Sequence, residues 1–475
     1  QAGAPISLAL QSLPDDDKTF LSQLNSLLAK AGGFAHPLPK APLGSDQAVA
    51  RLLTAYTVEK LKRAKPEQLR AHPAAMEFPG LVAGDAIIEN RELSIDTAVP
   101  GWHSTGLYAA PGALIKVVFP EEEITKGYRV RIGCHADAIW HHEKWSRVPE
   151  ITVSTKIEGR ETRSANAFGG LIYIEVPEKT PGFPVKCTIQ GAVGAPFFVL
   201  GKTTAVEWLK QRIKPGPWAE LQCGRVILTI PSEHIRQLDD PTQVAKFWDD
   251  VVRLEDELSG IAHLRKRPER IVADVQISAG YMHSGYPIMT HLDVAGNVAD
   301  LAKMQAGSWG HFHELGHNHQ VGDWTFEGTG EVTCNIFSLY IMEKLCGKPP
   351  GQGHDAMEPA RVARRLAQHL RGDAALKWDR WKGDAFLALT MYHQLRMGFG
   401  WEAYSKVFVE YRDLPKAERP KTDQDKRDQW MIRFSRAVGR NLGPFFEAWG
   451  VPVTEGALEQ IKDLPAWMPE DWPQA

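Results

Sequence analysis

The chain has 475 residues, of which 43% are hydrophobic and 24% are charged, and its formal net charge at pH 7 is -3. This composition is that of a soluble globular protein with about two to four domains, and the small net charge argues against a nucleic acid or an anionic membrane as partner. The longest apolar runs, such as residues 195–200, are too short to span a bilayer, and five widely spaced cysteines without a C-x-x-C pair predict neither a disulfide framework nor a cysteine zinc site.

Residues 1–5 include no initiator Met and no charged or apolar leader region. They fit a chain whose signal peptide has been removed, or a chain prepared for expression without one. Residues 1–78 place apolar side chains at helical spacing, as at Phe20, Leu24 and Leu28. This spacing predicts a helical N-terminal segment with a packing role.

Residues 79–200 change to short alternating apolar runs that are bounded by Gly and Pro. Runs at this spacing predict a β-sandwich domain. The clearest of them cover residues 114–119, 129–133, 151–155 and 171–176.

The same region holds a group of polar side chains that includes three histidines. They are His135, His141, His142, Asp137 and Glu143. One interpretation is a second metal site. Their spacing matches no metal-ligand pattern, so we favour solvated loop histidines.

Residues 201–355 mix strand-like and helix-like patterns, which predicts an α/β subdomain. Residues 224–230 and 270–278 are apolar runs typical of strands, and residues 241–258 have the spacing of an amphipathic helix. A further strand is predicted at residues 286–290.

The predicted strand at residues 286–290 stands shortly before a histidine-rich stretch at residues 311–320. In zinc peptidases an edge strand upstream of such a stretch commonly holds the substrate backbone by strand addition. Two interpretations stay open: an edge strand that contributes Tyr286 to substrate binding, or an interior strand with both edges paired.

The histidine-rich stretch contains His313-Glu314-Leu315-Gly316-His317, an uninterrupted H-E-x-x-H. On a helix, residues four apart lie on one face, so the two imidazoles can bind one tetrahedral zinc ion while the glutamate beside them is free to act as a base. The alternative is a chance match on a polar, half-exposed helix. The motif therefore needs a third ligand.

The third ligand is predicted downstream, where residues 328–335 join a glycine-bearing loop to an apolar helix. Glu331 lies on the first turn of that helix, and two histidines with one glutamate form a catalytic zinc set whose fourth position is open to water. Asn335 follows on the same face, where its side chain can fix the tautomer of a ligating histidine. Glu327 is the rival ligand. It lies within the loop, so we prefer Glu331.

The boundaries of the motif helix are predicted at Ser308, its N-cap, and at Gly322, where it ends. From residue 356 to residue 475, apolar positions again recur at helical spacing. This predicts a helical C-terminal subdomain that closes one wall of the cleft. The chain as a whole is predicted to be a multidomain α+β protein.

The run H-E-L-G-H-N-H-Q at residues 313–320, followed by G-E-V-T-C-N-I-F-S-L-Y at residues 330–340, resembles the signature of the enhancin-like, mucin-degrading gluzincin zinc metallopeptidases. Residues 105–112, 280–288 and 399–402 resemble segments that flank the motif in that family. The resemblance implies a β-domain followed by a zincin-like catalytic domain.

This resemblance also implies one Zn²⁺ bound by His313, His317 and Glu331, with Glu314 as the general base. The implied activity is that of a secreted, cell-surface or periplasmic endopeptidase. Its implied substrates are O-glycosylated, mucin-type proteins, cut next to a Ser or Thr that bears the glycan.

A glycan-dependent site needs an aromatic face for the sugar ring and polar groups for its hydroxyls. Trp324, Thr329 and the backbone of Gly328 and Gly330 lie between the two metal-binding elements and are the candidates. For Trp324, a packing role that holds the loop has equal weight.

The loop at residues 321–330 offers no Tyr or His to stabilise a tetrahedral oxyanion. The donor must therefore come from elsewhere or be the zinc itself. Tyr392 and His393, on a later predicted helix, are the candidate donors.

Two other functions stay open. A gluzincin exopeptidase without glycan dependence would need an acidic pocket for the α-amine of the substrate, and the sequence identifies none. A non-catalytic carbohydrate-binding protein with a structural zinc would need four protein ligands, and the sequence offers three.

Overall fold

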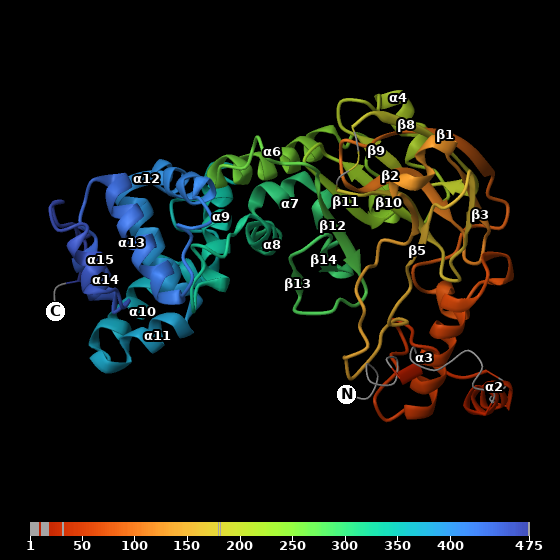
Figure 1. Cartoon of the computed structure of the whole chain (residues 1–475), viewed down its shortest axis with the longest axis horizontal. Coiled ribbons are helices and arrows are strands. Elements are labelled where there is room, and N and C mark those ends of the chain that lie inside the picture. Colours follow the sequence, from red (N-terminus) through yellow and green to blue (C-terminus); the bar gives the residue numbers. More distant parts are fainter. Residues whose placement is uncertain (1–8, 11–18, 31–32, 179, 181, 474–475) are drawn as a thin grey trace. The chain divides into compact units, whose positions relative to one another are not determined.

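The computed structural model describes residues 9–10, 19–30, 33–178, 180 and 182–473 (Figure 1). The chain forms two compact units. The first comprises Gln1–Lys246 and Lys266–Asp300, and the second comprises Phe247–Arg265 and Leu301–Ala475. Within the described ranges, no helix is both long and apolar enough to cross a membrane.

Residues 1–8, 11–18 and 31–32 of the predicted helical segment lie outside the described residues, and its described part contains α2 (Phe20–Lys30) and α3 (Ala48–Arg63). The apolar face of α3 is buried. Arg51 of this helix lies over the ring of Trp145, 3.8 Å from the ring centroid, and donates hydrogen bonds to the carbonyl oxygens of His142 and Glu143. These contacts fasten the helical segment to the β-domain.

The β-domain is one eight-stranded sheet in which every pair of neighbours is antiparallel. Its strands are β1 (Ile88–Asp96), β2 (Gly101–Ala109), β3 (Ile115–Val118), β4 (Arg129–Ile132), β5 (Val153–Lys156), β6 (Glu161–Ser164), β7 (Gly170–Val176) and β8 (Pro184–Gly194). The order is β5-β4-β7-β2-β8-β3-β6, and β1 also pairs with β8. The end strands meet, because Thr155 Oγ1 and Ser164 Oγ lie 2.8 Å apart. The sheet therefore folds around a single apolar core, as the predicted sandwich requires.

A second sheet of the first unit has six strands in the order β13-β14-β12-β11-β10-β9. They are β9 (Phe197–Val199), β10 (Trp218–Gln222), β11 (Val226–Pro231), β12 (Glu269–Asp274), β13 (Met282–His283) and β14 (Ile288–His291), accompanied by α4 (Ala205–Gln211) and α5 (Glu233–Arg236). A buried ion pair between Arg270 of β12 and Glu220 of β10 also reaches β7, because Tyr173 donates to Glu220 at 3.0 Å. This network joins the two sheets of the first unit.

Of the two interpretations of residues 286–290, the interior strand holds and the edge strand does not. β14 pairs with β12 on one side and with β13 on the other, so both of its edges are used. Tyr286 packs inside the first unit, where its hydroxyl accepts a hydrogen bond from the backbone N–H of Trp102 and its ring lies under Arg267. These contacts give Tyr286 a packing role.

The expectation of solvated loop histidines holds for His141, which is exposed, and fails for His135. His135 is buried, His141 Nε2 lies 2.7 Å from the carbonyl oxygen of Ser278, and His142 Nε2 lies 2.9 Å from that of Ile277. Asp137 Oδ2 lies 2.8 Å from His283 Nε2. These side chains tie the β-domain loop to the segment between β12 and β13, and they form no metal-ligand cluster among the described residues.

The second unit is helical, as predicted for the C-terminal part of the chain. It contains the part of α6 (Thr242–Ser259) from Phe247 onward. Its other α-helices are α7 (Leu301–Ala306), α8 (Trp309–His319), α9 (Gly330–Lys344), α10 (Pro359–Arg371), α11 (Lys377–Gly383), α12 (Ala385–Asp413), α13 (Asp423–Val438), α14 (Gly443–Trp449) and α15 (Glu455–Glu459). α12 is interrupted at Gly400, whose φ is 75°. The core of this unit is rich in aromatic side chains, among them Trp324, Phe408 and Trp430.

Short 3₁₀ helices occur in both units. They are η1 (Pro66–Gln68), η2 (Pro73–Met76), η3 (Glu121–Lys126), η4 (Leu292–Val294), η5 (Asn297–Ala299), η6 (Asp355–Met357) and η7 (Ala374–Leu376).

Candidate metal centre

Helices α8 and α9 of the second unit pack against each other at a glycine. Gly316, inside the H-E-x-x-H motif, lies so close to α9 that a Cβ atom on it would be 2.4 Å from the carbonyl oxygen of Cys334. Only glycine permits this approach. The two helices that carry the predicted ligands are therefore in direct backbone contact.

The motif helix starts at Trp309, directly after the predicted N-cap Ser308. Ser308 makes no side-chain capping bond, because its Oγ lies 2.7 Å from Nδ1 of the buried His311 instead. The helix ends at His319, three residues before the predicted end at Gly322. Its H-E-x-x-H residues are therefore helical throughout.

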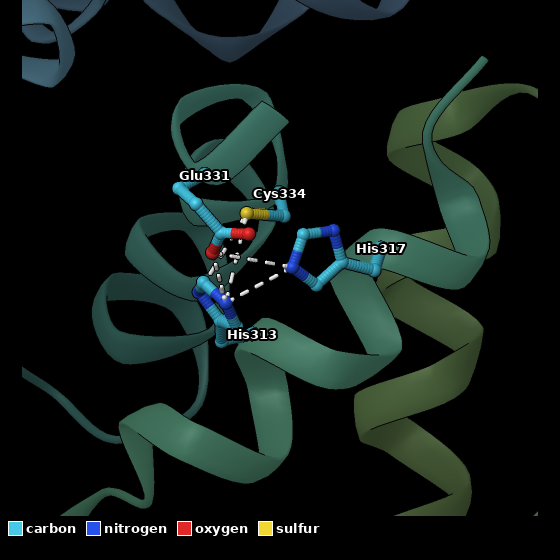
Figure 2. Close-up of side chains that lie close together, drawn as sticks. All are labelled: His313, His317, Glu331 and Cys334. Atoms are coloured by element: carbon cyan, nitrogen blue, oxygen red, sulfur yellow. Dashed lines mark hydrogen bonds and ion pairs between the residues drawn. The ribbon is translucent and has the colours of Figure 1, made fainter. Parts of the chain in front are cut away.

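Two imidazole nitrogens and a carboxylate oxygen converge between α8 and α9, as Figure 2 shows. His313 Nε2 lies 3.0 Å from His317 Nε2 and 3.0 Å from Glu331 Oε2. His317 Nε2 lies 3.5 Å from the same oxygen. In a tetrahedral zinc site, with bonds near 2.0–2.1 Å, such ligand atoms are about 3.3 Å apart. The three predicted ligand atoms therefore have the spacing of a zinc-sized site.

Asn335 holds the far nitrogen of His313, as the spacing on α9 predicts. Its Nδ2 donates to the carbonyl oxygen of Glu331 at 2.7 Å, so its Oδ1 is the acceptor that lies 2.7 Å from His313 Nδ1. The proton of a neutral His313 ring is thereby kept on Nδ1, and Nε2 presents its lone pair to the other ligand atoms.

Gln320, which was not predicted from the sequence, accepts a hydrogen bond from the far nitrogen of His317. Its Nε2 donates to the carbonyl oxygen of Gly330 at 2.8 Å and to Thr333 Oγ1 at 2.6 Å, so its Oε1 accepts from His317 Nδ1 at 2.7 Å. Two lone-pair nitrogens and a carboxylate this close repel one another unless a cation lies between them. The chemistry of the donor set therefore fits a bound metal ion.

Cys334 is the fourth metal-ligand type of side chain in the group. Its Sγ lies 3.6 Å from His313 Nδ1 and 3.9 Å from His313 Nε2. A metal ion bound to His313 lies on the Nε2 side of the ring, so another ligand of that ion should be nearer to Nε2 than to Nδ1. The sulfur of Cys334 is instead nearer to Nδ1. Burial raises the pKa of the thiol, and the carboxylates of Glu331 and Glu314 raise it further. Cys334 thus packs beside the His313 ring, and its sulfur is not placed as a fourth ligand.

The two remaining acidic candidates differ in their surroundings. Glu314 is buried and lies on α8 between the two ligating histidines in sequence. Glu327 is exposed and forms an ion pair with Lys382, whose Nζ lies 2.9 Å from its Oε1. Among the side chains that gather at the centre, Glu331 is present and Glu327 is not.

The end of α8 is fixed by a buried charged cluster that involves His319. His319 Nδ1 donates to the carbonyl oxygen of Leu315 at 2.7 Å, while its Nε2 lies 2.9 Å from Asp256 and its Nδ1 3.1 Å from Glu255. Burial by itself would lower the pKa of His319, but the two carboxylates outweigh burial and raise the pKa to about 9. A charged His319 therefore anchors the metal-binding helix to α6.

The predicted glycan contacts are mostly inside the protein. Trp324 is 0% exposed and its ring packs on Phe408. Thr329 is also buried, and its hydroxyl donates to the carbonyl oxygen of Phe326. A ring without exposed surface cannot stack on a sugar, so the predicted sugar-facing role of Trp324 is wrong and its alternative packing role holds.

The two glycines of the predicted glycan set lie at the loop and helix boundary. Gly328 has a φ of 83° and packs against Lys382, where a Cβ atom would be 2.4 Å from the Cβ atom of that lysine. Gly330 begins α9, and its carbonyl oxygen accepts a hydrogen bond from Gln320. Their backbone positions the ligand-bearing helix.

The predicted oxyanion donors do not lie at the metal centre. Tyr392 is 2% exposed and packs in the aromatic core against Trp430. His393 packs against Gly351 and lines a cavity of about 770 Å³ whose walls include none of the four metal-centre residues.

His354, which was not predicted from the sequence, lies closer to the metal centre than Tyr392 and His393 do. The ring of His354 contacts that of Trp309, with centroids 5.1 Å apart, and Trp309 is the first residue of α8. Burial lowers the pKa of His354, a neighbouring Asp355 raises it, and His313 lowers it again. His354 and the ligand His313 are therefore near enough to interact electrostatically. No local spacing in the sequence relates the two residues.

A helix with H-E-x-x-H, followed by a second helix whose glutamate completes an open three-ligand set, defines the architecture of a gluzincin-type metallopeptidase. Residues 191–450 match the family described as peptidase M60, enhancin and enhancin-like, and residues 86–190 match the N-terminal domain of M60-like peptidases. The chain belongs to this peptidase M60 family, which confirms the resemblance noted in its sequence.

Several animal proteins are similar in sequence. Human TRPM8 channel-associated factor 2 is 40% identical over 400 residues, which are 83% of this chain and 41% of the human protein. Mouse TRPM8 channel-associated factor 3 is 40% identical over 371 residues, 77% of this chain and 40% of the mouse protein. The chain thus spans about two fifths of the length of these relatives.

Solved structures share the fold at lower identity. A functionally unknown conserved protein from Bacillus anthracis has a TM-score of 0.66 and 24% identity, with 80% of each chain covered. IMPa from Pseudomonas aeruginosa, solved with an O-glycopeptide, has a TM-score of 0.65 and 18% identity over 96% of this chain and 60% of its own. The catalytic module of the metalloprotease ZmpA from Clostridium perfringens has a TM-score of 0.61 and 15% identity, with 79% of each chain covered.

Proposed function

We propose that the protein is a zinc-dependent endopeptidase that cleaves O-glycosylated, mucin-type proteins next to a glycan-bearing Ser or Thr. One observation carries the proposal: the Nε2 atoms of His313 and His317 and a carboxylate oxygen of Glu331 converge within 3.5 Å of one another. The sulfur of Cys334, the fourth residue of the group, lies beside the His313 ring and not beyond its Nε2. An open position is what a catalytic zinc site has and a structural one lacks.

In this proposal His313, His317 and Glu331 hold one Zn²⁺, which when bound supplies a Lewis acid for the scissile carbonyl and lowers the pKa of water. Asn335 and Gln320 keep both ligating rings in the required tautomer. Glu314 accepts a proton from the attacking water and returns it to the nitrogen of the leaving amine.

The substrate part of the proposal draws on relatives of the same fold. The structure of IMPa was solved with an O-glycopeptide and also with T-antigen. A site that binds the sugar can use the binding energy of the sugar to stabilise the transition state. With such substrates, the protein is proposed to act outside the cell or at its surface.

A second candidate is favoured by the names of the animal relatives. Proteins that are 38–40% identical to this chain are called TRPM8 channel-associated factors. A protein of this kind would act by binding a membrane channel, and its metal centre would hold the fold together without turning over peptides. Hydrolysis that is absent while the metal is bound would favour this candidate.

The test is a cleavage assay on a peptide with one O-glycosylated Thr, its bare counterpart, and both peptides with acetylated N-termini. We expect chelator-sensitive cleavage of the glycopeptide and a kcat/KM at least about 100-fold lower for the bare peptide. Acetylation should leave the rate unchanged. Equal cleavage of both peptides would refute glycan dependence, and loss of cleavage on acetylation would favour an exopeptidase.

A further inference from the structure

His354 lies beside the metal-binding face of α8, and all residues that hold it there belong to the second unit. Its ring packs against Trp309, at 5.1 Å between centroids, and against Phe386, at 4.5 Å. Trp309 stands four residues before His313 on α8 and so shares its face. His313 also lowers the pKa of His354, so the two rings are near enough to interact electrostatically.

The hydrogen-bonding role of His354 is set by its own backbone neighbour. Its Nδ1 accepts a hydrogen bond from the backbone N–H of Ala356 at 3.1 Å, so Nδ1 carries a lone pair. In a neutral imidazole the proton must then be on Nε2. Burial, the main cause, keeps the pKa of His354 below its ordinary value, in favour of this neutral form. The side chain is therefore a hydrogen-bond donor through Nε2.

The position of His354 is fixed by packing as well. The ring is nearly parallel to that of Phe386, with an angle of 22° between their planes. The preceding Gly353 has a φ of 123° and lies against Met342 of α9, where a Cβ atom would be 2.7 Å from Met342 Cγ. The loop that carries His354 is thus anchored to the helix that carries Glu331. The ring is half-buried, so part of it faces solvent.

We propose that His354 is a catalytic residue whose Nε2–H donates a hydrogen bond to the scissile carbonyl oxygen as that oxygen becomes anionic. This inference rests on the proposed peptidase function. When the water oxygen bonds to the carbonyl carbon, the π electron pair moves onto the carbonyl oxygen and the water proton passes to Glu314. His354 keeps its own proton throughout. A fixed donor aimed at developing charge stabilises the transition state more than the bound substrate.

The test compares His354→Phe, which keeps the ring stacking but removes the donor, with His354→Gln, which keeps an N–H donor. His263→Phe, at an exposed histidine elsewhere in the second unit, is the matched control. Each zinc-loaded protein is assayed for metal content, for kcat and KM on the O-glycopeptide, and for the Kd of a phosphinic glycopeptide that mimics the tetrahedral intermediate.

We expect His354→Phe to bind the phosphinic peptide about 100-fold more weakly and to lose a similar factor in kcat, with KM and metal content little changed. His354→Gln should recover part of both losses, and the control should match the wild type. Wild-type binding of the phosphinic peptide by His354→Phe, or a loss confined to KM, would overturn the inference and leave the proposed function standing. A wild-type protein that cleaves no glycopeptide would overturn both.

Discussion

Asn335 Oδ1 lies 2.7 Å from His313 Nδ1, and this hydrogen bond turns the opposite nitrogen of the ring toward Glu331, 3.0 Å away. The amide therefore sets both the tautomer and the direction of a proposed zinc ligand without being a ligand itself. This relationship leads to the first prediction.

Asn335→Leu should weaken zinc binding by about 10- to 100-fold, because a ligating histidine without its outer hydrogen bond is less well oriented and less basic. The measurement is competition with a chromogenic chelator, with the fold monitored by circular dichroism. Asn25→Leu, on α2 in the first unit, serves as the control and should bind zinc as the wild type does. Unchanged affinity in folded Asn335→Leu would count against this role.

The choice of the third ligand is tested by a pair of glutamates in one short segment. Glu331→Ala should abolish stoichiometric zinc binding, because it removes one of the three convergent donor atoms. Glu327→Ala should keep the metal, because Glu327 pairs with Lys382 away from the donors. Elemental analysis of the purified variants reads out both. The reverse pattern would overturn the choice of Glu331.

The buried cluster at His319 predicts how stability depends on pH. The pKa of His319 is raised from about 6.5 in the unfolded chain to about 9, so its contribution is complete below pH 6.5 and is lost as the pH rises through 9. The metal-free protein should lose on the order of 3 kcal/mol of unfolding free energy over this range. Urea unfolding at several pH values between 6 and 10 measures the loss.

Two variants make the pH prediction specific. His319→Gln removes the histidine, so the part of the loss that is centred near pH 9 should disappear. Burial raises the pKa of Glu255 to about 7, so this carboxyl still titrates within the range. Glu255→Gln removes one of the two carboxylates that raise the pKa, so its loss should be intermediate. A loss in His319→Gln as steep as that of the wild type would show that another group titrates.

Local patterns in the sequence were enough to predict the site residues that lie on α8 and α9. His313 and His317 are one turn apart, and Asn335 is one turn beyond Glu331, so each pair shares a face wherever the helix goes. The meeting of the two helices depends on Gly316, whose missing Cβ lets α9 approach. The helical ends of the chain were predicted for the same local reason.

Features that depend on long-range packing were not predictable in this way. β1 has the sequence IENRELSID, in which few side chains are apolar, and it becomes a strand by pairing with β8, almost a hundred residues away. Whether β14 is an edge strand is decided by β13, a pairing of only two residues. His354 approaches α8 because a glycine-bearing loop folds back, and Trp324 is covered by α12. These contacts join residues far apart in the sequence, so residue spacing does not predict them.

Glu314 is proposed as the general base of a zinc peptidase, and turnover of the glycopeptide by Glu314→Gln decides whether it has this role. The amide keeps the size of the side chain and cannot accept the proton of the attacking water. We predict that Glu314→Gln binds one zinc ion per chain, as the wild type does, and that its kcat falls by at least about 1,000-fold. Substantial cleavage by a folded, zinc-loaded Glu314→Gln protein would contradict the mechanism.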